Sequence, residues 1–433
     1  MPVKTSPQPT RHARNPNARA WSRVLSLVGI VAAVALVSTV SIAAVGAWTF
    51  TSKVEENAVD IHPEQQGDEQ APPAIGALEG GFNVLVVAAD NDANQSQDLY
   101  GERDGATLND VNMLLHVSQD HKTAVAVSFP RDLIIAHPEC EKGDAMSAAP
   151  INEAWGRGGL PCVVATVSEL TGLDIQYAVS MTFDAVIALT DAIGGVPICL
   201  TGRVTDDNVV YPDENGELQH LDMPAGITEV KGGLAAGFLR SRHGVGDGGD
   251  LSRISSQQQY LSSLVRKMKS NDTLGDFGKL YSLANVVADP KYFTLSTSLT
   301  KVDTMVSMAQ ALRTIDLNNI TFVQYPGTTD DPDYPGKVVP TVDAADQLFA
   351  LIAADQPFTL GADSQPVGST TEPTSPADPA VPEAPTDPTV PEAPADPSVP
   401  VETPAPDAGA PAVLDGVTGS TALQETCAIP FED

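Results

Sequence analysis

The stretch FLRSRHGVGDGGDLSRISSQQQ, residues 238–259, gathers arginines in an otherwise acidic chain. The 433 residues include 24 Lys and Arg against 56 Asp and Glu. If LRSRH is extended, Arg240 and Arg242 point to the same face, because side chains alternate along a strand. Guanidinium groups match the geometry of phosphate oxygens, so this pair is suited to binding a phosphorylated ligand.

A helix is expected directly after this glycine-rich loop. Asp250 stands where an N-cap is expected, and Arg253 and Gln257 share one helical face because they are four residues apart. A helix N-terminus attracts anions through its free N–H groups and its dipole. The spacing predicts either a phosphate or pyrophosphate site, or a surface network of salt bridges to Asp247 and Asp250.

A further arginine follows a strand that is expected to be buried. Arg131 and Asp132 come directly after AVAVSF in the motif SFPRDL. Residues at strand ends commonly build the sites of open α/β sheets. The alternative is an ion pair within a turn.

Two aspartates border neighbouring apolar runs. Asp90 ends FNVLVVAAD, and Asp110 begins DVNMLLHV. If the two strands are adjacent, both carboxylates lie at one end of the sheet, where Mg²⁺ takes one or two carboxylates together with substrate oxygens and water. The alternative is two unrelated loop aspartates.

The N-terminal region differs in charge from the rest of the chain. Residues 1–23 hold five basic residues and no acidic one, and residues 24–52 carry no charge at all. An apolar run of this length is enough to span a bilayer, and the basic tail predicts a cytoplasmic N-terminus. A cleaved signal peptide is the alternative. The remaining chain has 19 basic and 56 acidic residues, which disfavours nucleic acid as a partner.

Composition also divides the remainder of the chain. Strand-like and helix-like patterns intermix, which predicts the α/β class, with helices at residues 161–173, 183–195 and 251–270. From residue 361 the chain becomes rich in proline and acidic residues, which favours a disordered, extended spacer. The expected parts are a basic cytoplasmic tail, a transmembrane helix, a stalk, a globular domain, a Pro-rich linker and a short C-terminal tail, at residues 1–23, 24–52, 53–80, 81–360, 361–413 and 414–433.

Four cysteines suggest two disulfides in an exported protein, with three possible connectivities. Proximity favours Cys140–Cys162, which leaves Cys199–Cys427 and ties the C-terminal tail to the domain. The chain has no Walker A motif, no GxSxG, and no GxGxxG after a strand, so nucleotide-binding and serine-hydrolase functions lack support.

The order of these motifs resembles the LytR–CpsA–Psr (LCP) cell-wall ligases over residues 81–270, more weakly to about residue 355. The motifs that carry the resemblance are NVLVVAAD, NDVNMLLHVS, VAVSFPRDL, INEAWGRGG, TFDAVIALTDAIGGV and LRSRHGVGDGGDLSRISSQQQYL. The resemblance implies a three-layer α-β-α sandwich around a mixed central sheet. It also implies a membrane-anchored phosphotransferase that moves a glycopolymer from a polyprenyl-pyrophosphate carrier to peptidoglycan through a phosphodiester, outside the cytoplasmic membrane.

Carried over to this sequence, the resemblance makes Asp90 and Asp110 the ligands of Mg²⁺ or Mn²⁺. It makes a pyrophosphate site of Arg131, Asp132, Arg240, Arg242, Arg253 and Gln257, with Asp90, Arg131, Arg240 and Arg242 catalytic. The carrier lipid needs an apolar tunnel, expected to be lined by residues 162–167 and 185–189. A non-catalytic binding or regulatory protein on the same fold, or a hydrolase of the carrier pyrophosphate, are the alternatives.

Three positions depart from the pattern of many family members, which have basic residues there. They are Leu108, Pro150 and Ser256. We expect the smaller number of cationic groups to affect the rate and the carrier preference more than the class of reaction.

Overall fold

The computed structural model describes residues 50–62, 80–90, 107–270, 276–371 and 411–431. The chain forms two compact units, Met1–Ser52 and Lys53–Asp433. The apolar segment 24–52 lies outside the described residues except for its last three positions. Among the helices that are described, none combines the length and apolar character needed to cross a bilayer.

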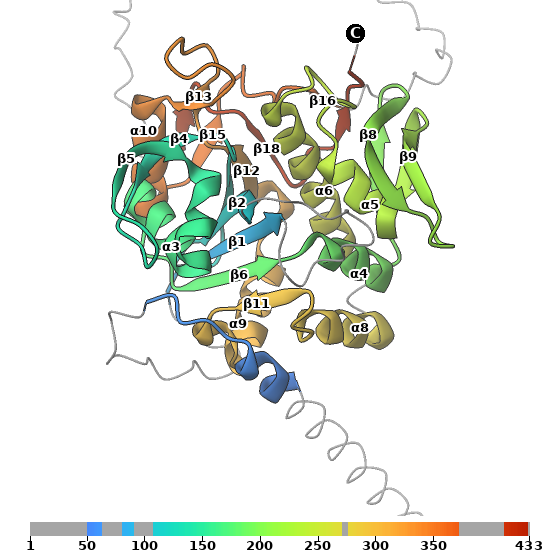
Figure 1. The fold of residues 1–433 in the computed structure, drawn as a ribbon, viewed down its shortest axis with the longest axis horizontal. Coiled ribbons are helices and arrows are strands. Elements are labelled where there is room, and N and C mark those ends of the chain that lie inside the picture. The colour runs from blue at the N-terminus through green and yellow to red at the C-terminus, as the bar shows by residue number, and fades with distance from the viewer. Residues whose placement is uncertain (1–49, 63–79, 91–106, 271–275, 372–410, 432–433) are drawn as a thin grey trace, which may run out of the picture. The chain divides into compact units, whose positions relative to one another are not determined.

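The second unit is built on a mixed sheet of seven strands in the order β11-β6-β1-β2-β3-β12-β18 (Figure 1). β1–β6 and β3–β12 are parallel pairs, and the other neighbours are antiparallel. The strands are Phe82–Asp90 (β1), Leu108–Val117 (β2), Ala124–Phe129 (β3), Tyr177–Met181 (β6), Phe293–Leu295 (β11), Ile320–Gln324 (β12) and Gly419–Thr421 (β18). The predicted α/β class is confirmed.

Helices lie on both faces of this sheet (Figure 1). Alternate residues of β1 explain this, because Leu85 and Val87 enter one core while Val86 and Ala88 face the other side. The first face is covered by Ala154–Thr171 (α3) and Val342–Ala353 (α10). The second face is covered by Phe183–Ile193 (α4), Gly232–Arg240 (α5), Asp250–Lys269 (α6) and Phe277–Val287 (α8). The described part of the chain also contains Val302–Thr314 (α9), a helical stretch at residues 50–56, and three short 3-10 helices at Ile151–Glu153 (η1), Thr297–Leu299 (η2) and Leu317–Asn319 (η3).

A second, smaller sheet has the order β10-β7-β19-β16 and packs against α6. Its strands are Val196–Leu200 (β7), Gly226–Val230 (β10), Ser369–Thr371 (β16) and Thr426–Ala428 (β19). Four two-stranded pairs surround the sheets: Ile134–His137 (β4) with Met146–Pro150 (β5), Val204–Pro212 (β8) with Leu218–Met223 (β9), Gly327–Thr328 (β13) with Val339–Pro340 (β14), and Phe358–Leu360 (β15) with Ala412–Leu414 (β17).

Both predicted disulfides are present. Cys140 bonds to Cys162 at a sequence separation of 22, and Cys199 bonds to Cys427 at a separation of 228. The second bridge joins neighbouring parallel strands, since Cys427 of β19 is paired in register with Cys199 of β7. The C-terminal tail is therefore part of the fold and supplies β17, β18 and β19.

The structure moves two boundaries that the sequence suggested. β16 lies inside the range 361–413, so residues 361–371 belong to the folded unit and residues 372–410 are outside the described part. α3 begins at Ala154 rather than at Pro161. It is kinked at Gly158 and Gly159, where Gly159 has φ of 64°, and the regular helix that the sequence predicted follows this kink.

Candidate functional site

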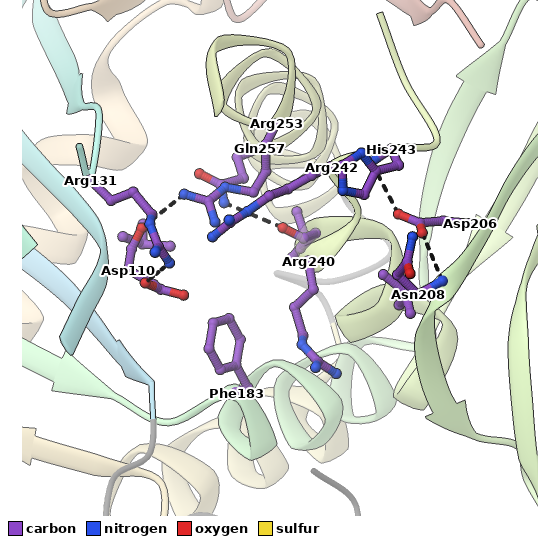
Figure 2. A pocket seen from close by; sticks show the side chains of 13 residues that line it. Asp110, Arg131, Phe183, Asp206, Asn208, Arg240, Arg242, His243, Arg253 and Gln257 are labelled. Atoms are coloured by element: carbon purple, nitrogen blue, oxygen red, sulfur yellow. Dashed lines mark hydrogen bonds and ion pairs between the residues drawn. The ribbon is translucent and has the colours of Figure 1, made fainter. Parts of the chain in front are cut away.

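A pocket of ≈250 Å³ brings together residues from β2, the turn after β3, α4, β8, α5 and α6 (Figure 2). Its lining includes four arginines and two aspartates, which gives a formal balance of +2 in a chain whose net charge is −32. The charged and polar lining residues are Asp110, Arg131, Asp206, Asn208, Arg240, Arg242, His243, Arg253 and Gln257. The predicted arginine cluster is therefore assembled in one place.

Arg240 and Arg242 line the pocket, but they do not lie on the strand that the sequence predicted. Arg240 is the last residue of α5, and the chain becomes extended at Ser241, with φ −62° and ψ 131°. The prediction of an extended LRSRH is wrong because Phe238 and Leu239 are buried on a helix, together with Ala235 and Ala236. Three glycines in this short helix had masked its periodicity.

Asp110 sits at a bulge in the pairing of β1 with β2. Ala88 pairs with Val111 and Ala89 pairs with Asn109, which leaves Asp110 without an opposite residue. A bulge re-aims a side chain, and here the nearly buried Asp110 carboxylate lines the pocket and forms an ion pair with Arg131 Nη1. Arg131 follows β3 as predicted, and Figure 2 shows it pointing toward Asp110 and Arg253.

The start of α6 is tied to both of these strands. Gly249 is the N-cap, so the prediction that Asp250 caps the helix is wrong. Asp250 is the first helical residue, and its carboxylate accepts a hydrogen bond from the Arg131 backbone N–H (3.3 Å) and pairs with Arg253 (2.5 Å). Arg253 in turn donates from Nη2 to the backbone oxygen of Asp110 (3.3 Å). These bonds fix the positions of Arg131, Arg253 and Asp110 relative to one another.

Among the pocket arginines, Arg242 has the positive charge that neighbouring protein groups compensate least. Among the described residues it has no hydrogen-bond or ion-pair partner, and the Nε atom of the buried Arg253 also lacks one. Burial and the positive charges of Arg253 and Arg131 lower the pKa of Arg242, against a smaller opposing effect of Asp110 and Asp250. An anion bound here would offset that repulsion. The alternative of a surface salt-bridge network explains Arg253 with Asp250 but not Arg242.

The opposite wall contains residues that the sequence analysis did not single out. The Arg240 guanidinium lies 5.8 Å from the centre of the Phe183 ring, within cation–π range. Buried Asp206 accepts hydrogen bonds from the Ser241 hydroxyl (2.7 Å) and from the His243 backbone N–H (3.2 Å). Asp206 thus fixes the chain on both sides of Arg242. Its sequence context, TDDN in a hairpin, carries no signal for this role.

Gln257 lines the pocket as predicted and donates to the backbone oxygen of Leu239 (3.3 Å). Asp132 does not line the pocket; its carboxylate binds Lys337 (2.6 Å) and lies 3.5 Å from Arg131 Nε. Asp132 is therefore placed to orient Arg131, not to contact a ligand in the pocket.

The Asp90 backbone pairs with Leu108, two residues before Asp110, while the Asp90 side chain lies outside the described part of the structure.

A second, almost wholly apolar cavity of ≈350 Å³ adjoins this pocket. The two share four lining residues, Val111, Phe183, Leu239 and Gln257. The cavity runs between the sheet and the helices, past Met113, Met181, Leu189, Tyr260, Leu264 and Met268. Within the predicted lining at residues 185–189, Val186 and Leu189 line the cavity. The prediction for residues 162–167 is wrong, because Cys162 and Val163 of α3 pack in the core on the other face of the sheet.

The three positions that depart from the family pattern add no cation to the pocket. Leu108 opens β2, and Pro150 precedes η1 as its N-cap. Ser256 is buried, and its hydroxyl donates to the Ser252 backbone oxygen inside α6 (3.3 Å). The cationic charge of the pocket thus comes from its four arginines.

Fold and site together define an α/β protein in which a cationic pocket opens onto an apolar cavity. The chain belongs to the LytR_cpsA_psr family, whose model matches residues 48–348. It is 28% identical over 376 residues to the cell wall biosynthesis protein LcpA of Corynebacterium glutamicum, covering 79% of this chain and 66% of LcpA. It is 24% identical over 246 residues to the polyisoprenyl-teichoic acid–peptidoglycan teichoic acid transferase TagT of Bacillus subtilis, covering 54% of this chain and 70% of TagT.

The probable cell wall biosynthesis protein LcpB of Corynebacterium glutamicum is 30% identical over 252 residues, and the chain spans about half of its length. Among solved structures, protein gbs0355 from Streptococcus agalactiae superposes with a TM-score of 0.52 at 16% identity, covering 64% of this chain and 88% of that one. This likeness supports the fold.

Proposed function

We propose that this protein is a phosphotransferase that moves a glycopolymer from a polyprenyl-pyrophosphate carrier onto peptidoglycan through a phosphodiester. The observation that carries the proposal is the shared wall between the arginine pocket and the apolar cavity. A carrier of this class has a pyrophosphate joined directly to a long hydrocarbon chain, so it needs both environments side by side. The relative TagT is named as a transferase of this kind, acting between polyisoprenyl-teichoic acid and peptidoglycan.

In this arrangement the pyrophosphate lies among Arg131, Arg240, Arg242 and Arg253, and the prenyl chain follows the cavity toward Met268. Phe183 belongs to both linings, so it marks the junction between phosphate and hydrocarbon. Planar guanidinium forks bind phosphate oxygens with two parallel hydrogen bonds. Each buried methylene of the chain adds about 0.8 kcal/mol to binding.

The reaction replaces the phosphoanhydride bond of the carrier by a phosphate ester bond to the acceptor. A hydroxyl of the acceptor attacks the phosphorus atom that carries the glycan. The bond from that phosphorus to the bridging oxygen breaks, and polyprenyl phosphate leaves with the bonding electrons while the hydroxyl proton passes to a base or to water. Catalysis of such transfers depends on positioning and on stabilising charge on the transferring group, which are the roles we assign to the arginines.

The residues present fit a magnesium or manganese ion as an assisting cofactor. Asp110 places a carboxylate beside the arginines, and the Asp90 backbone lies at the same end of the sheet. Mg²⁺ commonly takes one or two carboxylates and completes its shell with phosphate oxygens and water. When bound, the ion would neutralise charge on the pyrophosphate. The described residues contain no group of three or more acidic, His or Cys side chains that could hold a metal alone.

We further propose that residues 24–52 anchor the protein in the cytoplasmic membrane with residues 1–23 inside and the folded unit outside. The proposal rests on the uncharged length of the segment and the basic tail before it. Two disulfides in the folded unit agree with an oxidising compartment.

The test uses the full chain in detergent with a labelled glycan on a short-chain polyprenyl pyrophosphate, with and without peptidoglycan fragments and Mg²⁺. Mass spectrometry of the acceptor should show a glycan joined by one phosphate. Release of phosphorylated glycan at the same rate without acceptor would instead identify a hydrolase. Carrier binding without either product would identify a non-catalytic binding protein.

A further inference from the structure

The end of the described chain pairs with the loop that carries Arg242. Residues 429–431, which we call the strap, run antiparallel to residues 244–246, which belong to the arginine loop, residues 241–249. The Gly246 N–H donates to the Ile429 oxygen (2.8 Å), and the Phe431 N–H donates to the Gly244 oxygen (3.1 Å). Between these bonds, Val245 and Pro430 form an antiparallel bridge.

The strap is anchored on its other side. It continues β19, which the Cys199–Cys427 disulfide joins to β7, and the Ile429 N–H donates to the Gly368 oxygen (2.9 Å). The strap therefore bridges the rigid second sheet and the arginine loop. Figure 1 shows the red C-terminal segment at β16 and α6, beside β8.

The arginine loop needs such support because of its composition. Four of its nine residues are glycine, the residue with the greatest backbone freedom. Gly246 has φ of +58°, and an added Cβ would lie 2.7 Å from Gly368 Cα, so backbone packs directly against backbone there. A Cβ on Gly248 would lie 3.2 Å from the Phe431 ring. The strap adds two backbone hydrogen bonds to those that Asp206 and Ser252 make with this loop.

The arginine loop is joined at both ends to residues of the site, so its position affects the site. Arg242 stands near the beginning, and Asp250 and Arg253 follow its end at the start of α6. We propose that the strap is a positioning element of the catalytic site, which clamps the arginine loop so that Arg242 faces the pyrophosphate. This inference rests on the proposed function for its effect on turnover, although the clamp itself is a property of the fold.

The strap contributes little to the core, which makes the proposal testable. Ile429 is 36% exposed and Phe431 is 37% exposed. Its removal therefore leaves the central cores, both disulfides and β19 in place. A variant ending at Ala428 lacks the strap, and a control ending at Phe431 keeps it.

Three measurements separate positioning from stability. Hydrogen exchange of peptides covering residues 241–249 should be faster in the variant that ends at Ala428 and unchanged in the control. Turnover of the carrier should fall about tenfold, the loss expected when one charge-assisted hydrogen bond is misplaced. In an Arg242→Ala background, the same truncation should change turnover less than about twofold, because residues acting through one another are not additive.

Unchanged exchange in the loop would overturn the clamp, and faster exchange with unchanged turnover would overturn its effect on the site. Equal losses in the Arg242 and Arg242→Ala backgrounds would show a general loss of stability instead. If the full chain transfers no glycan, the proposed function fails. The strap is then judged by loop exchange and by the affinity for inorganic pyrophosphate, which should weaken in the strap variant and not in the control.

Discussion

Replacing Arg242 by an uncharged side chain of similar length should lower turnover by a factor of about ten or more without lowering stability. Arg242 has no hydrogen-bond or ion-pair partner among the described residues and faces the like charges of Arg131 and Arg253. Those charges and burial lower the pKa of Arg242, so the folded state holds this proton less favourably than the unfolded chain does. The penalty is present throughout the neutral range, because arginine remains charged there.

The sign of the stability change follows from linkage. A basic group whose pKa is lowered on folding costs stability at every pH below its unfolded value. Arg242→Met removes that cost and keeps most of the apolar stem, so its midpoint of thermal unfolding should equal or exceed that of the unmodified protein. Arg242→Lys retains a charge but loses the two-pronged fork, so it should keep the penalty and lose function.

The effect on turnover is larger. Charge-assisted hydrogen bonds contribute about 1.5–3 kcal/mol each, and each 1.4 kcal/mol is a factor of about ten in rate. We expect Arg242→Met to lower kcat/KM by about tenfold to a hundredfold, and Arg242→Lys by somewhat less. Calorimetry should also show that inorganic pyrophosphate stabilises the unmodified protein more than either variant.

The opposite pattern would refute this reasoning. If Arg242→Met unfolds several degrees lower and yet turns over the carrier normally, Arg242 belongs to a structural ion-pair network. Arg203→Met is the matched control, because Arg203 is an exposed arginine that pairs with Asp222 (Nε to Oδ1, 2.7 Å) on the β8–β9 hairpin. It should leave turnover unchanged.

The remaining predictions concern the cavity, the metal and the long disulfide. Leu264→Trp should fill part of the apolar cavity and raise KM for the carrier more than tenfold. If two methylenes of the prenyl chain are no longer buried, at about 0.8 kcal/mol each, the lost binding free energy exceeds the amount that corresponds to a factor of ten. Binding of inorganic pyrophosphate should stay unchanged. Asp110→Asn should remove the dependence of turnover on Mg²⁺, and full activity of the unmodified protein in a chelator would contradict the metal proposal. Converting Cys199 and Cys427 to Ser should lower the free energy of unfolding by up to about 5 kcal/mol in the chain-entropy model for a loop of 228 residues, measured in urea.

Local patterns predicted the elements that have strong periodicity. β1, β3, α4 and α6 were found within two residues of their expected ends, because their apolar spacing is regular and glycine or the loop marks the boundary. The disulfides followed from counting cysteines, from the proximity of Cys140 to Cys162 and from the expectation that the chain is exported. The four arginines of the pocket were predicted from the chemistry of arginine, from spacing around a helix start and from the family resemblance.

The features that the sequence did not reveal depend on packing between segments of the chain. α5 is a helix because its small residues let it pack closely on β8: a Cβ on Gly233 would clash with the Pro212 backbone, and one on Gly237 would lie 3.0 Å from the Tyr211 ring. Asp206 enters the site only because β8 runs beside α5. Neither contact leaves a periodic signal.

The chain carries a strongly negative net charge, whereas its pocket is cationic. Salt screens exposed charges beyond about 8 Å at physiological ionic strength, whereas partly buried groups are screened much less. An anion that reaches the pocket therefore meets four arginines and not the net charge of the chain. An anion bound beside Arg242 would offset the repulsion that Arg131 and Arg253 impose on it. Under the proposed function that anion is the pyrophosphate of the carrier, and the repulsion is a small cost in the stability of the folded protein that its binding would offset.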